Sequence, residues 1–265
     1  MMTRLTGAVL TLLFAAPLPG AAAPPVPAPA PALTELYADA RQPDISGLWL
    51  LTGAFYFAPD RSVPELLGEY KALYARRMQA FDAGHPIDDV TADCLPAGMP
   101  HMDVVPYPFE IMQTPGRVTI LYEYDSVVRR IPVGTTGSGA GDSGTAASAA
   151  AADVDPNYYG VSAGHWEGDT LIVETRHIRA DTQVDFSGLP HSDALTITER
   201  FRRKDATTLE NRITLDDPKA YAAPFTVTRL YRLHPRWKIA EYSCSENNRN
   251  RTDAQGRTSS GVAER

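Results

Sequence analysis

The stretch "LTITERFRR", residues 195–203, decides the fold, because its side chains alternate between two kinds. One face carries Leu195, Ile197, Glu199 and Phe201, and the other carries Thr196, Thr198, Arg200 and Arg202. A period of two is that of a β-strand with one buried face. The stretch therefore predicts a strand that separates an apolar interior from solvent, with one carboxylate on the apolar side.

The same alternation recurs on both sides of this strand. Downstream it runs through "LENRITL", "FTVTRLYRL" and "WKIAEYS", and upstream through "FEIMQTPGRVTILYEYDSVVRRIPV" and "GHWEGDTLIVET". We expect strands at about 159–166, 169–177, 194–203, 207–215, 225–233 and 236–244. Short turns such as Glu167-Gly168 pair neighbouring strands antiparallel. The pattern predicts a mainly β chain that forms an antiparallel barrel or a strongly curved sheet.

Two features near the start refine this fold class. In "DISGLWLLTG", Gly47 and Trp49 resemble the Gly-x-Trp opening of lipocalin-like (calycin-type) barrels, in which the tryptophan plugs one end. A helix is predicted over about 63–83, with Ser62 and Glu65 as a capping box and Pro64 in the first turn. Its apolar face, predicted to pack on one face or end of the barrel, comprises Leu66, Tyr70, Leu73, Tyr74, Met78 and Phe81.

The N-terminus predicts export from the cell. Residues 1–23 combine Arg4, an apolar run and small residues, as in a signal peptide. A stiff Pro/Ala linker follows at 24–32. The expected location is the periplasm or the exterior, and the alternative is a membrane anchor that stays attached. A single domain is expected over 33–247, with a flexible Gly/Ser/Ala loop at 134–156 and a polar tail at 248–265.

The chain has two cysteines, Cys94 and Cys244. In an oxidising compartment this count favours one disulfide that closes a long loop, worth about 4 to 5 kcal/mol in a chain-entropy model. The alternative is two buried thiols.

Charge and motifs exclude several classes of protein. A formal net charge of −7 argues against general nucleic-acid binding. The histidines and cysteines show no metal-ligand spacing, so we expect neither a metal nor a cofactor. A metal site built from loop histidines that converge in space stays open. The expected partner is a small-molecule ligand or substrate, with no nucleic acid and no stable membrane span, and the oligomeric state stays open.

Four successive predicted strands each place one polar residue in the inward row: Glu199, Asn211, Arg229 and Glu241. A buried ion-pair network, with Arg229 between the two carboxylates, would explain them structurally. The functional interpretation is a pocket in which Glu199 or Glu241 transfers a proton and Arg229, with Asn211, orients a ligand. The two interpretations are compatible.

Histidines supply further candidates, because their pKa suits acid–base chemistry near neutral pH. "GMPHMDVVPYPFE" places His101, Asp103 and Tyr107 just before the first long strand pair. "SGLPHSDALT" places His191 and Asp193 at a strand entrance. We expect both segments at the barrel rim, with His101 and His191 as catalytic candidates. Tyr107 and Asp193 are candidates for substrate binding.

His165 and His177 flank the "WEGDTLIVET" hairpin and are further substrate-binding candidates. The Glu-Gly-Asp turn between them is explained by hairpin chemistry alone. Which of the two histidines reaches the pocket stays open.

Five blocks in order, "CLPAGMPHMDVVPYPFEIMQTPGRVTILYE", "GHWEGDTLIVET", "LPHSDALTITERFRR", "TLDDPKAYAAPFTVTR" and "EYSCSENNRN", resemble a large group of uncharacterised secreted bacterial proteins. That group is common in sphingomonads and soil bacteria. The resemblance covers about residues 90–250 and places both cysteines in matched blocks, which supports their pairing. It implies no settled activity, and the chain departs from it in the long loop at 134–152.

Two functions follow as expectations. The first is a secreted acid–base enzyme (lyase, isomerase or hydrolase) that acts without a cofactor on a small, partly apolar molecule. The alternative is a lipocalin-like protein that binds such a molecule without turnover.

Overall fold

The computed structural model describes residues 42–57, 63–134, 154–246, 250–255 and 258–260. They belong to one compact unit, Leu33–Arg265. The predicted signal peptide and linker, and residues 135–153 of the predicted loop, lie outside the described residues.

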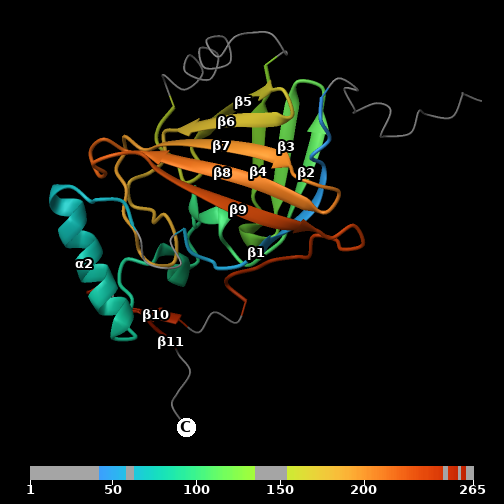
Figure 1. The fold of residues 1–265 in the computed structure, drawn as a ribbon. Helices are drawn as coiled ribbons and strands as arrows, with labels where there is room; N and C mark the ends of the chain where they lie inside the picture. The colour runs from blue at the N-terminus through green and yellow to red at the C-terminus, as the bar shows by residue number, and fades with distance from the viewer. Residues whose placement is uncertain (1–41, 58–62, 135–153, 247–249, 256–257, 261–265) are drawn as a thin grey trace, which may run out of the picture. The chain divides into compact units, whose positions relative to one another are not determined.

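Nine strands form one sheet in which hydrogen-bonded neighbours are antiparallel. Along the sheet the order is β4-β3-β2-β1-β9-β8-β7-β6-β5. Their bounds are β1 Gly47–Thr52, β2 Phe109–Thr114, β3 Arg117–Tyr122, β4 Val128–Pro132, β5 Val161–Glu167, β6 Thr170–Arg176, β7 Thr196–Arg203, β8 Thr208–Asp216 and β9 Phe225–Leu233. The predicted mainly β, antiparallel barrel is confirmed (Figure 1).

The barrel nearly closes where β4 meets β5. Eight antiparallel steps separate these edge strands in the order above, so they run in the same direction. They touch through a parallel bridge between Val133 and Gly164, and the Gly134 amide donates to the Gly164 carbonyl at 2.9 Å. A parallel junction requires a long connection, which the chain supplies between Pro132 and Val161.

Trp49 fills the end of the barrel at which β1 begins and β7 ends. Its side chain is fully buried, and its indole N–H donates to the Ile45 carbonyl at 3.1 Å. The Arg203 guanidinium lies 5.3 Å from the Trp49 ring centre. Gly47 has φ +133°, and a Cβ there would lie 2.6 Å from Leu233 Cδ1, so this position requires glycine. The plug predicted from Gly-x-Trp is present.

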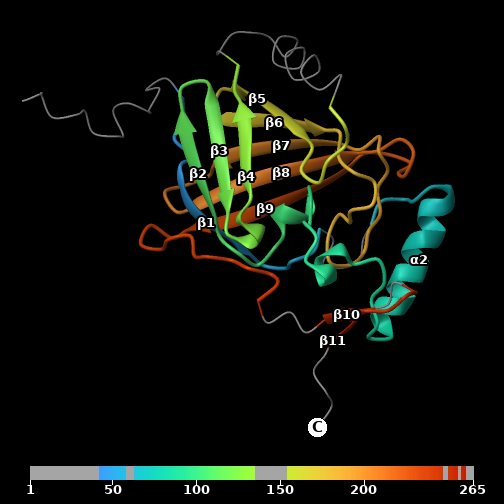
Figure 2. The same cartoon turned by 180° about the vertical axis from the view of Figure 1, so that it is seen from behind.

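The opposite end, called here the loop end, carries the long connections (Figures 1 and 2). The short helix η2 (His101–Asp103) is buried there, and the Tyr231 hydroxyl of β9 donates to the Asp103 carbonyl at 2.9 Å. Helix α2 (Gly68–Asp82) lies beside the β6–β7 and β8–β9 connections. The remaining short helices are η1 (Val90–Asp93) and η3 (Tyr124–Ser126).

The predicted helix start at residue 63 is wrong. Ser62 lies outside the described residues, and Leu66 pairs with Tyr221 in an isolated bridge, so α2 begins only at Gly68. The predicted apolar face is only half-buried, because α2 lies over connections rather than on the sheet. Leu66, which precedes α2, is buried, and Phe81 is 36% exposed. Arg77 is the buried residue of α2, and its Nη1 donates to the Gly188 carbonyl at 3.2 Å.

The predicted strand at 236–244 is wrong as well. β9 already pairs with β8 on one edge and β1 on the other, so it has no free edge for a following strand. Residues 234–246 therefore run without strand pairing, and Glu241 is exposed. The predicted polar tail is partly structured, because β10 (Asn250–Thr252) pairs with β11 (Thr258–Ser260).

The disulfide between Cys94 and Cys244 is confirmed, with the Cα atoms 5.5 Å apart and a sequence separation of 150. It attaches the unpaired 234–246 segment to the loop after η1.

We predict that the free energy of unfolding is about 4 to 5 kcal/mol lower in the variant Cys94→Ala/Cys244→Ala than in the wild type, because the cross-link restricts the unfolded chain. Urea unfolding monitored by circular dichroism measures the loss. Adding reductant should weaken the wild type and leave the variant unchanged. Equal stability of the two proteins in oxidising buffer would contradict the prediction.

Candidate functional site

The barrel interior contains a polar cluster around Glu199. Glu199 and Asn211 are fully buried, as their place in the inward rows predicts, and Asn211 Nδ2 donates to Glu199 Oε1 at 3.3 Å. The cation that pairs with Glu199 is Arg129 of β4. Arg129 Nη1 donates to Glu199 Oε1 at 3.1 Å, and Nη2 donates to Oε2. Both partners are almost completely buried.

Hydroxyl groups complete the cluster. Arg129 Nε donates to Ser162 Oγ at 3.1 Å, and Nη2 donates to Thr175 Oγ1 at 2.7 Å. The two hydroxyls are themselves 2.9 Å apart. Because the guanidinium bonds both Glu199 oxygens, the structural interpretation of Glu199 as an ion-pair member fits the geometry better than a free catalytic base.

The predicted bridging role of Arg229 is wrong. Arg229 stands opposite Asn211 in the β8–β9 register but lies half-buried near the loop end. Its Nη2 donates to the Tyr56 carbonyl, its guanidinium lies 5.5 Å from the Phe57 ring centre, and its Nε has no partner in the described chain. Arg229 therefore holds the loop after β1, and its charge acts on the Asp185 and Asp103 carboxyl groups rather than on Glu199 and Glu241.

Glu241 does not join the cluster. It lies exposed on the 234–246 segment, outside the barrel. The predicted inward position of Glu241 is wrong, because residues 234–246 form no strand.

His191 and Asp193, predicted at a rim, occupy different environments. His191 is buried, and its ring nitrogens contact Thr182 Oγ1 at 2.8 Å and the Ser192 carbonyl at 2.9 Å. Burial lowers the pKa of His191. Asp193 is exposed and accepts a hydrogen bond from Lys219 Nζ at 2.7 Å. Both ring nitrogens of His191 are thus engaged within the fold, and Asp193 lies on the surface.

The remaining candidates are also spread apart. His165 pairs with Glu167 at 3.1 Å beside the β5–β6 turn, away from the loop end. His177 has φ +58°, and its carbonyl accepts from the Asn157 amide at 3.0 Å. The Tyr107 ring packs against Tyr124 and Tyr242. The structure does not bring these three residues together.

Asp103 adds a second carboxyl group to the interior. Burial, together with the charge of Glu199, raises the pKa of Asp103 well above its usual value, although Arg129 and a hydrogen bond from Tyr122 oppose the rise. Asp103 Oδ2 has no hydrogen-bond partner among the described residues. Since Arg129 is engaged by Glu199, Asp103 favours the protonated, uncharged form.

His101 is the other unusual group of η2. Its side chain is 1% exposed, and neither ring nitrogen has a hydrogen-bond partner within the described ranges. Burial lowers the pKa of His101 to about 3, so the imidazole is neutral. The ring of Phe186 packs edge-on against it, with centroids 4.2 Å apart.

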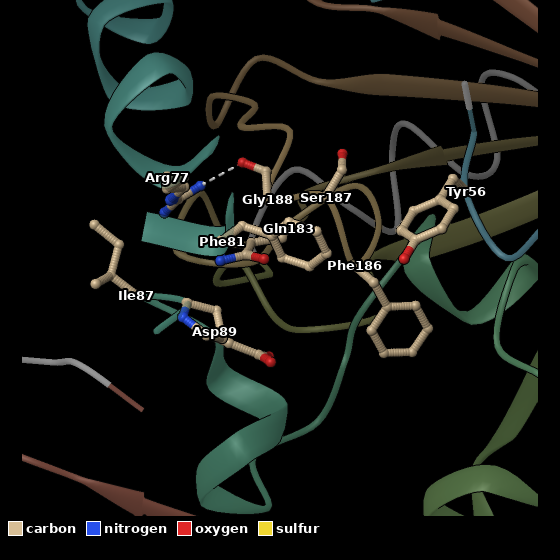
Figure 3. A pocket seen from close by; sticks show the side chains of 10 residues that line it. Tyr56, Arg77, Phe81, Ile87, Asp89, Gln183, Phe186, Ser187 and Gly188 are labelled. Carbon is tan, nitrogen blue, oxygen red and sulfur yellow. Dashed lines mark hydrogen bonds between the residues drawn. The ribbon is translucent and has the colours of Figure 1, made fainter. Parts of the chain in front are cut away.

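A pocket of about 260 Å³ opens at the loop end, and Phe186 is one of its lining residues. It lies between α2, the segment after α2 and the β6–β7 connection (Figure 3). Its lining includes the rings of Tyr56, Phe81 and Phe186 and the polar side chains of Arg77, Asp89 and Gln183. In Figure 3 the Tyr56 and Phe186 rings lie on the side opposite Arg77.

Hydrogen bonds hold the polar wall of this pocket in place. Arg77 Nε donates to Asp88 Oδ2 at 3.2 Å, and Gln183 Nε2 donates to the Asp88 carbonyl at 2.7 Å. Asp89 Oδ1 accepts from the Thr91 amide at 3.0 Å. The wall is thus pre-organised, with its polar groups fixed before a ligand arrives.

Over the described ranges, no group of three or more His, Cys, Asp or Glu side chains is arranged to hold a metal ion. None of the described helices has the length and apolar character needed to span a bilayer.

Comparison with known proteins leaves the family open. No protein-family model matches the chain, and no curated protein matches it. Among solved structures, the chain is similar to a mutant of the fluorescent protein UnaG, with 15% identity, 71% of this chain and 95% of that chain covered, and a TM-score of 0.32. At that TM-score the likeness carries no argument. The resemblance of the five sequence blocks to a secreted bacterial group stays a prediction.

The sequence did not predict the role of Arg129 or the pocket at the loop end. A signal for Arg129 exists, because in "VRRIP" it alternates with the inward Ile131. Arg77 and Phe186 carry no comparable signal, since one lies on a helix and the other in a loop.

We predict that Glu199→Gln lowers the free energy of unfolding by about 3 to 5 kcal/mol, because it leaves the buried Arg129 uncompensated. The double variant Arg129→Met/Glu199→Leu should recover much of this loss, since it removes both charges. Chemical denaturation measures both. Glu167→Gln, which breaks the exposed pair with Arg200, is the matched control and should stay close to the wild type. A loss for Glu199→Gln no larger than for this control would refute the buried-pair account.

We also predict a pH dependence from His101. Its folded pKa lies below its unfolded value, so its contribution is present above pH 6.5 and is lost as the pH falls towards 3. Between pH 7.5 and pH 5 the wild type should lose about 2 kcal/mol relative to His101→Gln. Parallel urea titrations at the two pH values measure the difference. The variant His85→Gln, which changes an exposed histidine, should lose as much stability between the two pH values as the wild type. If His101→Gln also loses as much as the wild type, the prediction for His101 is wrong.

Proposed function

We propose that this protein is a barrel that binds a small, partly apolar molecule at its loop end. The observation that carries the proposal is the pocket beside α2, in which aromatic rings stand opposite a hydrogen-bonded polar wall. Ligand sites commonly combine mostly apolar walls with a few fixed polar groups. In such a site the aromatic rings contribute affinity, and Arg77 and Gln183 orient the ligand.

The size of the pocket limits the ligand. At about 260 Å³ it lies just below the roughly 300–1,000 Å³ usual for drug-sized ligands. The pocket as it stands therefore suits a compact molecule of about one ring rather than a long-chain lipid.

We further propose that the protein works in the periplasm or outside the cell. The signal-like N-terminal sequence and the Cys94–Cys244 disulfide support this location, because disulfides persist in oxidising compartments.

A second candidate function is acid–base catalysis without a cofactor, as in a lyase, isomerase or hydrolase. The observation that favours it is the buried Asp103, with a raised pKa and an unpartnered Oδ2, beside Glu199. A carboxylic acid held protonated at neutral pH is able to act as a general acid. In this version Asp103 takes the role that the sequence suggested for Glu199 or Glu241.

We predict that aromatic fragments of about ten heavy atoms bind saturably and perturb the amide NMR signals of Gln183 and Gly188. Phe81→Ala should weaken this binding about fivefold, because losing roughly 40 Å² of apolar contact costs about 1 kcal/mol. Met112→Ala removes a similarly exposed apolar side chain from β2, outside the pocket lining, and should leave binding unchanged. No saturable binding from a panel of neutral, anionic and cationic fragments would refute the proposed pocket.

Turnover separates the two candidate functions. For any fragment that binds, Asp103→Asn should retain binding and abolish conversion if the protein is an acid–base enzyme. Binding by the wild type without conversion at any pH from 5 to 9 would identify a carrier.

A further inference from the structure

We propose that the pocket continues behind the Phe186 ring to His101, and that the site takes an uncharged molecule with an apolar body and one hydroxyl or amide group, which bonds the His101 imidazole. This inference rests on the proposed function, because it names the ligand class of the same site.

The first observation is the state of His101. A neutral imidazole has one donor and one acceptor, and here both lack partners among the described residues although the side chain is 1% exposed. Leaving a buried polar atom unpaired is unfavourable, because the atom loses its hydration and gains no partner. By contrast His191, equally buried, has both ring nitrogens engaged. The two unpartnered nitrogens of His101 are therefore the feature that calls for a ligand.

The second observation is that Phe186 contacts both the pocket and His101. Its ring lines the pocket, and the same ring packs edge-on against His101 at 4.2 Å. A ligand that displaces this ring reaches the imidazole directly.

The backbone around Phe186 is fixed, so displacement is a motion of the ring. Asp185 is buried; its Oδ2 accepts from the Phe57 amide at 2.7 Å, and its Oδ1 accepts from the Ser187 amide at 2.9 Å. These bonds hold both neighbours of Phe186 in place. Rotation about side-chain torsions is a fast motion that needs no loop opening.

The third observation concerns charge. Burial keeps His101 neutral, and Asp103, two residues further along the same turn, favours its uncharged form. The buried charges of Arg129 and Glu199 neutralise one another. Arg229, the other cation near Asp103, bonds the Tyr56 carbonyl and interacts with the Asp103 and Asp185 carboxyl groups. A charged group pushed behind Phe186 would have to compete with these interactions and would lose its hydration at a high free-energy cost. This environment selects an uncharged ligand.

One set of probes tests the inference: 4-fluorophenol, which is uncharged and carries a hydroxyl, fluorobenzene, which lacks one, and 4-fluorobenzoate, which is charged. Binding is measured by ¹⁹F NMR titration against the wild type, Phe186→Ala and Phe186→Ala/His101→Leu. Phe186→Ala opens the passage to His101, and the double variant removes the hydrogen-bonding ring at similar apolar character.

We expect 4-fluorophenol to bind Phe186→Ala at least about tenfold tighter than the double variant, the difference of one hydrogen bond to a buried group. Fluorobenzene should bind the two variants alike, and 4-fluorobenzoate should bind the Phe186→Ala variant more weakly than 4-fluorophenol. Equal affinity of 4-fluorophenol for both variants, or preference for 4-fluorobenzoate, would overturn the inference.

A second measurement keeps the test independent of how well His101→Leu folds. In ¹⁵N-histidine-labelled Phe186→Ala, 4-fluorophenol should shift the ring nitrogen signals of His101, and those of His191 should stay unchanged. Perturbed Gln183 and Gly188 amides with unmoved His101 signals would overturn this inference and leave the proposed function standing. Unperturbed amides in both the wild type and Phe186→Ala would overturn both.

Discussion

The Arg129–Glu199 ion pair is the interaction on which the closed barrel depends. The two edge strands, β4 and β5, run in the same direction and share little main-chain bonding. Arg129 of β4 crosses this junction, bonding Ser162 of β5, Thr175 of β6 and Glu199 of β7. Asn211 of β8 extends the chain of side-chain bonds. A bidentate, buried pair with further hydroxyl partners has the geometry needed to offset desolvation.

This pair also shapes the chemistry of the interior. Glu199 takes up the Arg129 guanidinium, and the charges of Arg129 and Arg229 do not outweigh the burial of Asp103, which favours its uncharged form. His101, on the same turn, is also neutral, because burial lowers its pKa. The loop end therefore combines a fixed, partly charged rim around Arg77 with an interior in which His101 and Asp103 are uncharged. The two proposed functions, small-molecule binding and acid–base catalysis, would both use this contrast between rim and interior.

The strands could be predicted because alternation is local. Five of the six ranges predicted after residue 158 form strands within about two residues, from β5 to β9. The inward positions of Glu199 and Asn211 followed from the same pattern. The sixth range, 236–244, had placed Glu241 in an inward row, and it forms no strand. A strand needs a free partner edge, and that edge of β9 is paired with β1.

The sequence by itself determined the barrel, the buried carboxylate, the Trp49 plug and the pairing of two cysteines. The barrel and the buried carboxylate follow from side-chain alternation, and the plug follows from the Gly-x-Trp pattern. The pairing follows from the presence of two cysteines. Only the tertiary structure decided that Arg129 and not Arg229 meets Glu199, and that Phe186 from a distant loop covers His101. The physical reason is distance along the chain: contacts between residues 70 or more positions apart are fixed by how the barrel closes and how its loops pack, and no local period encodes them.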